Sequence, residues 1–207
     1  MPLTELHRAV AEHTGAFHCE RIHKPQQTKT VTFQHRIQPP APLLDAPLPD
    51  VGRLPAFYAT FGSVLLYHDA DTGDAARYIA PPTEWAVLRE AFEGWTEHLG
   101  DEERDDLLPD WVDHCLVIGE TPHSGNYVLM ATDSDCAGRV FEFDHDGFEF
   151  TEKGADLVEY VQGPLHPDSA ALTDIASHMR FIDKRTGAQW WILEMSDNQG
   201  HRVRTHT

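Results

Sequence analysis

Apolar and polar residues repeat along this chain with two different periods, and the period indicates the type of each element. Leu3, Leu6 and Val10 recur at spacings of three and four, which predicts an amphipathic helix over Leu3–His13. Apolar residues occupy alternate positions in Lys29–Ile37, which predicts a strand. The chain therefore begins with a helix and then a strand.

The next part of the chain starts with a proline-rich segment. Six prolines between Pro39 and Pro55 exclude a regular helix or a central strand, so we expect a linker or a wrapped arm. After it we expect a short helix over Leu54–Phe61 and strands over Ser63–His68 and Arg77–Ala80. A longer helix, capped by Thr83 and ended by Gly100, should precede an acidic loop. The core-facing stripe of this longer helix consists of Trp85, Leu88, Phe92, Trp95 and Leu99.

Two apolar segments have the pattern of central strands. Cys115–Ile118 and Tyr127–Ala131 are apolar at nearly every position, which is typical of burial on both faces of a sheet. Arg139–Phe150 then alternates phenylalanine with acidic residues, and Asp146-Gly147 is a common hairpin turn. This register places Phe143 opposite Phe150 and predicts that the phenylalanines share one face while the acidic residues share the other.

The last part of the chain predicts helices over Ala155–Val161 and Asp168–Ala176. A hairpin should join Arg180–Asp183 to Gln189–Glu194, with Gly187 in the left-handed conformation. We therefore expect an α+β fold with a mainly antiparallel sheet and helices packed against it. We treat residues 1–207 as one domain, with a core over 50–163, an N-terminal arm over 1–50 and an extension over 164–207.

The charge of the chain limits the classes of macromolecule that it can bind. The formal net charge is −18 with histidines neutral, so nucleic acid and anionic membranes should be repelled and a basic protein attracted. Protonating all fourteen histidines would leave a net charge of −4, so binding by charge should weaken below about pH 6.5. No apolar run is long enough to span a bilayer, no secretory leader is visible, and the three cysteines suit a reducing cytoplasm.

Catalytic and metal-binding patterns are weak in this sequence. His68 and His145 lie beside aspartates, but no HExxH, CxxC or His-x-His spacing accompanies them. Asp144-His145-Asp146-Gly147 fails as a calcium loop, because Glu149 and Ala155 occupy the positions that need glycine and an acid. No serine elbow or glycine-rich phosphate loop is present. We therefore expect no catalytic, cofactor-binding or metal-binding residues.

A set of short motifs resembles one protein family. Residues 50–163 resemble the SUKH superfamily, which includes the yeast cell-wall glucan-synthesis regulator, the bacterial Syd protein and many bacterial immunity proteins. The motifs are Leu54-Pro55 with Phe57-Tyr58 and Phe61-Gly62, the helix Pro81–Trp95, Ile118-Gly119-Glu120, Gly125–Leu129 and Gly138–Asp146. Phe61-Gly62 replaces the usual Asn-Gly pair, and Asn126 replaces a frequent acid. The first 50 residues and those after Pro164 have no counterpart.

The resemblance implies an α+β fold and non-enzymatic protein binding, in bacteria often the neutralisation of a toxin, commonly a nuclease. We therefore expect an acidic surface that occludes a basic site of the toxin. The expected partner-binding residues are Asp133, Asp135, Glu142, Asp144, Glu149 and Glu159. Three alternatives stay open. The acidic residues can be an ordinary solvated sheet face, the protein can be a housekeeping scaffold of the same fold, or it can be a metal-dependent hydrolase using His68 or His145.

Overall fold

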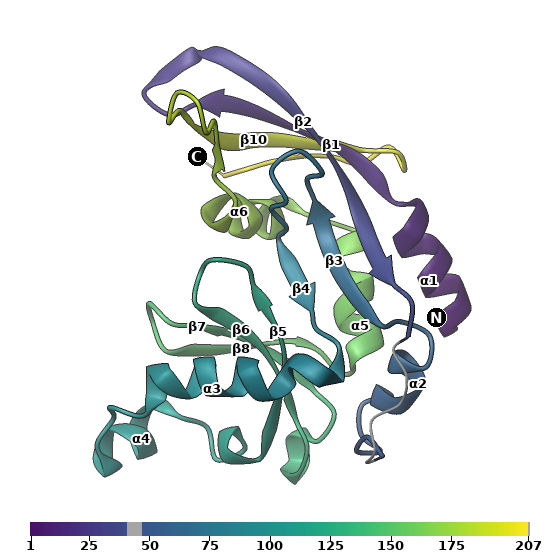
Figure 1. Cartoon of the computed structure of the whole chain (residues 1–207), viewed down its shortest axis with the longest axis vertical. Helices are drawn as coiled ribbons and strands as arrows, with labels where there is room; N and C mark the ends of the chain where they lie inside the picture. The colour runs from purple at the N-terminus through teal and green to yellow at the C-terminus, as the bar shows by residue number, and fades with distance from the viewer. Residues whose placement is uncertain (41–46, 207) are drawn as a thin grey trace.

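A computed structural model describes residues 1–40 and 47–206 of this chain, so part of the expected proline-rich arm, residues 41–46, lies outside the described residues. It contains an antiparallel sheet with helices against it, which confirms the α+β fold (Figure 1). The strands are β1 (Thr14–Arg21), β2 (Lys24–Gln38), β3 (Ser63–His68), β4 (Arg77–Ile79), β5 (Cys115–Thr121), β6 (Asn126–Ala131), β7 (Val140–Asp144), β8 (Glu149–Gly154), β9 (Phe181–Ile182), β10 (Gln189–Asp197) and β11 (Arg202–Arg204). The helices are α1 (Leu3–Glu12), α2 (Leu54–Tyr58), α3 (Trp85–Thr96), α4 (Asp101–Leu107), α5 (Leu157–Gln162) and α6 (Ser169–His178), with short 3-10 turns η1 (Pro82–Glu84), η2 (Val112–His114), η3 (Ser134–Cys136) and η4 (Gly163–Leu165).

The strand order is β11-β10-β1-β2-β3-β4-β5-β6-β7-β8, with β9 paired to β10. Both ends of the chain thus meet in one half of the sheet, where β1 lies between β2 and β10. We call β1, β2, β10 and β11 the terminal strands and β5–β8 the middle strands. These names refer to positions along the chain, because the two edges of the sheet are β11 and β8. The N-terminal segment and the C-terminal extension therefore continue the same sheet as residues 63–154.

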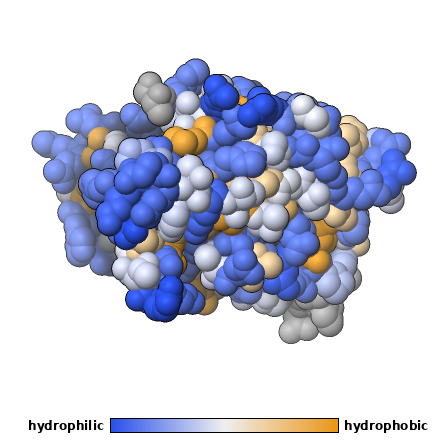
Figure 2. Space-filling model, turned by 90° about the horizontal axis from the view of Figure 1, so that it is seen from above, coloured by the Kyte–Doolittle hydropathy of each residue, from blue (hydrophilic) through white to orange (hydrophobic). Residues whose placement is uncertain are grey.

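The terminal strands bury one face only. In β2, Val31, Phe33 and His35 are buried, whereas Thr32 and Gln34 between them are exposed. The alternation predicted for Lys29–Ile37 is therefore confirmed. Seen from above, the molecule presents a mostly hydrophilic surface (Figure 2).

Among the middle strands, β5 and β6 are largely buried on both faces, whereas β8 at the edge of the sheet is mostly exposed. Every residue of β6 is buried, which confirms the two-sided burial expected for Tyr127–Ala131. Val128 and Met130 join the core beneath α5, whereas Leu129 packs on the opposite side with Phe92 of α3. Figure 1 shows α3 lying across these strands on the face away from α5.

The β7–β8 hairpin has the predicted register. Phe143 pairs with Phe150 and Asp144 with Glu149, but the connecting loop has four residues, 145–148, instead of the expected two. The rings of Phe148 and Phe150 lie 5.6 Å and 5.0 Å from that of Phe143, so these phenylalanines share one face as expected.

The helices differ from expectation around residues 83–107. Thr83 does not cap the long helix, because η1 occupies residues 82–84 and α3 begins at Trp85. α3 ends at Thr96 instead of Gly100, and the expected acidic loop is instead the helix α4. No helix of the described residues is long and apolar enough to cross a membrane.

Candidate functional site

The predicted acidic face is divided between separate places. Asp144 and Glu149 pair at one end of the β7–β8 hairpin, whereas Asp133 and Asp135 lie at the other end of β7, at the turn η3 that precedes it. Glu159 is an exposed residue of α5. The structure therefore brings Asp144 and Glu149 together, but it does not gather all the predicted residues into one surface.

Glu142 was expected to point outward, and this prediction is wrong. Its side chain is only 18% exposed, because α5 and α6 cover this face of the hairpin. Its carboxylate accepts hydrogen bonds from Arg77 Nε and Nη2 and from the Tyr160 hydroxyl, at 2.8 Å in the last case. Burial opposes ionisation, but the Arg77 charge holds the pKa of Glu142 below its usual value.

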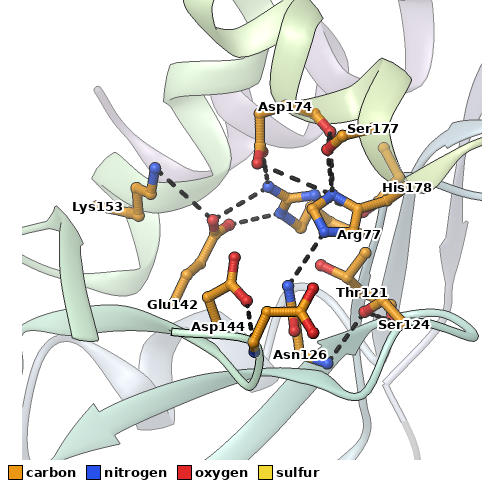
Figure 3. Close-up of polar contacts among 12 residues, drawn as sticks. Arg77, Thr121, Ser124, Asn126, Glu142, Asp144, Lys153, Asp174, Ser177 and His178 are labelled. Carbon is orange, nitrogen blue, oxygen red and sulfur yellow. Dashed lines mark hydrogen bonds and ion pairs between the residues drawn. The ribbon is translucent and has the colours of Figure 1, made fainter. Parts of the chain in front are cut away.

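Arg77 of β4 is the centre of this network (Figure 3). Its guanidinium also donates to the Asp174 carboxylate and to the Ala76 carbonyl, and Lys153 Nζ lies 3.8 Å from Glu142 Oε2. Burial opposes the Arg77 charge, but the neighbouring carboxylates raise the pKa of Arg77 above its already high value. We call Arg77, Glu142 and Asp174 the arginine clasp. It links β4 and β7 to α6 by satisfied charges, so its chemistry is structural.

A cleft of about 430 Å³ lies beside the arginine clasp. Tyr67, Lys153 and His166 contribute polar groups to it, and Ala171 and Ile175 of α6 contribute apolar ones. Positive and negative side chains line it together, so its charge selects no ligand class.

The polar network continues from the arginine clasp to the hairpin turn (Figure 3). His178 Nδ1 lies 2.9 Å from the Asp174 carbonyl, and Asn126 Nδ2 donates to His178 Nε2 at 3.1 Å. Asn126 Oδ1 accepts from His145 Nδ1 at 2.7 Å. Each of these groups binds another in the chain, so together they fix the position of the β7–β8 turn.

Metal-binding groups are sparse in residues 1–40 and 47–206. The one set of three possible ligand atoms within 4.8 Å of one another there comes from the consecutive residues Asp144, His145 and Asp146. His145 Nε2 lies 3.2 Å from Asp146 Oδ1, and the three residues are consecutive, so their closeness follows from the turn itself. His68 is buried, and its Nδ1 has no hydrogen-bond partner in the described residues.

Two of the three cysteines, Cys19 and Cys115, have inactive thiols. Cys19 and Cys115 are buried with the core, whereas Cys136 is only partly buried. Burial raises the pKa of Cys19 to about 12 and that of Cys115 to about 11, although Arg89 lies near the second thiol. Both thiols therefore stay protonated near neutral pH.

The densest negative surface lies on residues 84–113, which we call the acidic arm. It has eleven acidic and two basic residues, a net charge of −9 out of the −18 of the chain. All eleven acidic side chains are exposed: Glu84, Glu90, Glu93, Glu97, Asp101, Glu102, Glu103, Asp105, Asp106, Asp110 and Asp113. α4 projects from the sheet at the end of α3 (Figure 1). Glu103 accepts the Gly100 N–H at 3.0 Å, and acidic residues in the first turn favour this helix.

Three large apolar side chains are exposed on the same arm. Val87 is 67% exposed, Leu107 is 40% exposed and Trp95 is 39% exposed. Leu88 and Phe92 are buried as predicted for the stripe of α3, but Trp95 is only partly covered. Its ring packs 4.5 Å from that of His145, so it is held in place while part of it faces solvent.

Sequence reasoning missed both the arginine clasp and the position of the acidic arm. Arg77 is a lone charge between buried alanines and Ile79, which is a signal for a buried ion pair, but nothing local indicates Asp174 as its partner. The run Asp101–Asp106 was visible, and reading it as a loop hid its role as a helical surface. No family model, curated protein or solved structure matches this chain.

Proposed function

We propose that this protein is a binding module that docks a basic partner protein through the acidic arm. One observation carries the proposal: eleven exposed carboxylates and three exposed apolar side chains lie on one segment of 30 residues. The acidic arm carries half of the net charge of the chain, and its apolar groups supply contact area. This surface replaces the dispersed residues of the β7–β8 face as the preferred site.

The two kinds of residue have different tasks. Clustered charge steers a basic protein toward the arm and accelerates encounter, but exposed ion pairs add little affinity. Affinity comes from apolar and aromatic anchors, and tryptophan is the most frequent of these. Trp95 suits this task because its ring is already fixed against His145, so binding orders little.

The resemblance to the SUKH superfamily suggests the role of such binding. We propose an immunity-type function, in which the arm covers the basic surface of a toxin such as a nuclease. The toxin is then unable to bind its own substrate. The α+β fold supports this assignment. A toxin gene immediately upstream would favour it, and an isolated gene would favour a housekeeping scaffold. Stoichiometric zinc or manganese bound at His68 or His145 in purified protein would favour a hydrolase instead.

The test compares two pairs of charge reversals. Asp105→Lys with Asp106→Lys changes α4, whereas Asp135→Lys with Glu149→Lys changes the originally predicted face by the same charge. All four side chains are exposed, so both variants should fold. Each variant and the unchanged protein would capture partners from the source cell at low and moderate salt, and association would be followed with the purified partner.

We expect the α4 variant to slow association at low salt by about tenfold, and the matched variant to leave it within about twofold. Trp95→Ala should mainly accelerate dissociation. Loss of association in the Asp135/Glu149 variant alone would move the site to the β7–β8 face. A partner that is itself acidic would contradict the proposal.

A further inference from the structure

Three histidines and one aspartate form a connected group between the two ends of the chain. His13 follows α1, His35 belongs to β2, Asp197 ends β10 and His201 lies in the β10–β11 turn. His13 Nδ1 lies 2.7 Å from His35 Nε2, and His13 Nε2 lies 2.8 Å from Asp197 Oδ2. His201 Nδ1 lies 2.7 Å from the same carboxylate oxygen. His13, His35 and the Asp197 side chain are buried, and we call these four residues the histidine latch.

One backbone group fixes the protons of the latch. The Tyr67 N–H donates to His35 Nδ1 at 2.8 Å, and a backbone amide can only donate. His35 Nδ1 therefore has no proton, and neutral His35 carries its proton on Nε2. That N–H donates to His13 Nδ1, so His13 in turn carries its proton on Nε2 and donates it to Asp197. Every hydrogen bond from Tyr67 to Asp197 thus runs in one direction.

Neither His13 nor His35 can accept an additional proton without breaking this series of hydrogen bonds. On His13 Nδ1 it would face the Nε2–H of His35, and on His35 Nδ1 it would face the amide of Tyr67. In the part of the chain that the structure describes, the other ionisable groups around His13 are His166 beyond η4, His201 and Tyr67, and Asp197 is the only carboxylate beside it. Asp197 is already occupied, because it also accepts the backbone N–H groups of Gln199 and His201.

The electrostatics agree with this geometry. Burial lowers the pKa of His35 to about 3, and the nearby His13 lowers it further in the same direction. Burial also lowers the pKa of His13, although Asp197 partly opposes that shift. Hydrogen bonds from His13 and His201 hold the pKa of Asp197 at about 2 despite its burial. At neutral pH the latch therefore consists of neutral His13 and His35 with an ionised Asp197.

The latch connects α1 and β2, near the N-terminus, to β10 and the β10–β11 turn, near the C-terminus. Beside it, the Asn198 side chain donates to the Glu12 carbonyl at 2.7 Å and accepts the Thr14 N–H at 3.2 Å. We propose that the histidine latch is an acid-sensitive device: protonation of its buried imidazoles releases α1 and the β10–β11 turn from the sheet, while the middle strands stay folded. A mildly acidic compartment or medium would thereby loosen one half of the molecule.

Hydrogen exchange with mass spectrometry tests the release. Between pH 7.5 and 5.5, after correction for intrinsic exchange, residues 3–14 and 195–204 should exchange about a hundredfold faster, about tenfold for each imidazole that is released, and residues 115–154 should change less than about twofold. His13→Gln with His35→Gln should abolish the difference between the two regions. His114→Gln, at a side chain that is 67% exposed, should preserve it.

A second measurement does not depend on a variant that folds. Nitrogen chemical shifts of the unchanged protein at pH 7.5 should show a proton on Nε2 and none on Nδ1 in both His13 and His35. A proton on Nδ1 of either ring would overturn the proposed chain. Equal acceleration of exchange in both regions at pH 5.5, or none in either, would overturn the proposed release.

Discussion

The terminal strands and the middle strands belong to one sheet but differ in burial and in charge. The terminal strands cover one core and leave Thr30 and Thr32 in solvent, whereas β6 is buried throughout between α3 and α5. Residues 1–40 and 164–207 have a net charge of +2, and residues 41–163 have a net charge of −20. The negative charge therefore lies in the part of the chain that contains β6, the strand covered by helices on both faces of the sheet. The acid-sensitive histidines lie in the half with a single core, which can open with less loss of packing.

The arginine clasp should be the strongest link between the two regions. Arg77→Met leaves Glu142 buried without its counter-charge, and breaking a buried pair in this way costs about 3–5 kcal/mol. We expect urea unfolding, followed by fluorescence and by circular dichroism, to show the two regions unfolding separately. Arg139→Met, which removes an exposed pair with Glu152, should leave the midpoint unchanged. A single unshifted transition for Arg77→Met would show that the clasp does not couple the regions.

The pH dependence of stability should come mainly from the terminal strands. His13 and His35 have folded pKa values below the unfolded value of about 6.5, so the unfolded chain binds more protons and stability falls as pH drops below 6.5. From pH 7.5 to 5.5 we expect a loss of about 2–3 kcal/mol for the two residues together. Urea titrations at several pH values measure it. Constant stability over this range would mean that both histidines take up protons as readily in the folded chain as in the unfolded chain.

Matched threonine and valine exchanges compare the two kinds of strand directly. Val128→Thr places a hydroxyl in a fully buried position of β6, which should cost about 1–3 kcal/mol. Thr32→Val, on the open face of β2, should change the free energy of unfolding by less than about 0.5 kcal/mol. Thermal denaturation measures both. Comparable losses would show that an unrecognised layer covers the open face.

Two glycine replacements should have small effects of opposite sign. Gly125 has φ +85°, and an added Cβ would lie 2.9 Å from the Trp95 ring, so Gly125→Ala should cost about 1–2 kcal/mol and shift tryptophan fluorescence. Gly94 in α3 has open space around it, so Gly94→Ala should stabilise the protein by about 0.5–1 kcal/mol. Unaltered fluorescence in Gly125→Ala would mean that Trp95 is not held against the β5–β6 turn.

Local patterns in the sequence predicted those parts of the fold that depend on local burial. The stripe of α1 and the alternation of β2 follow from repeated contact with one core, and the facing phenylalanines of the β7–β8 hairpin follow from contact with the core on the α3 side. β1 was not identified, because Thr14–Arg21 mixes buried and half-buried residues and its pairing with β10 joins positions near opposite ends of the chain. The arginine clasp was missed for the same reason, because Arg77, Glu142 and Asp174 meet only after three separate elements have packed.

The position of β1 between β2 and β10 also has a consequence for synthesis. While the ribosome is still making residues 41–188, a nascent chain can form the β1–β2 hairpin, but the other edge of β1 has no strand to pair with. Such an edge is a template for association with other chains. The emergence of Gln189–Asp197 closes it, so polypeptides truncated before this segment should aggregate, although they contain every residue of the acidic arm.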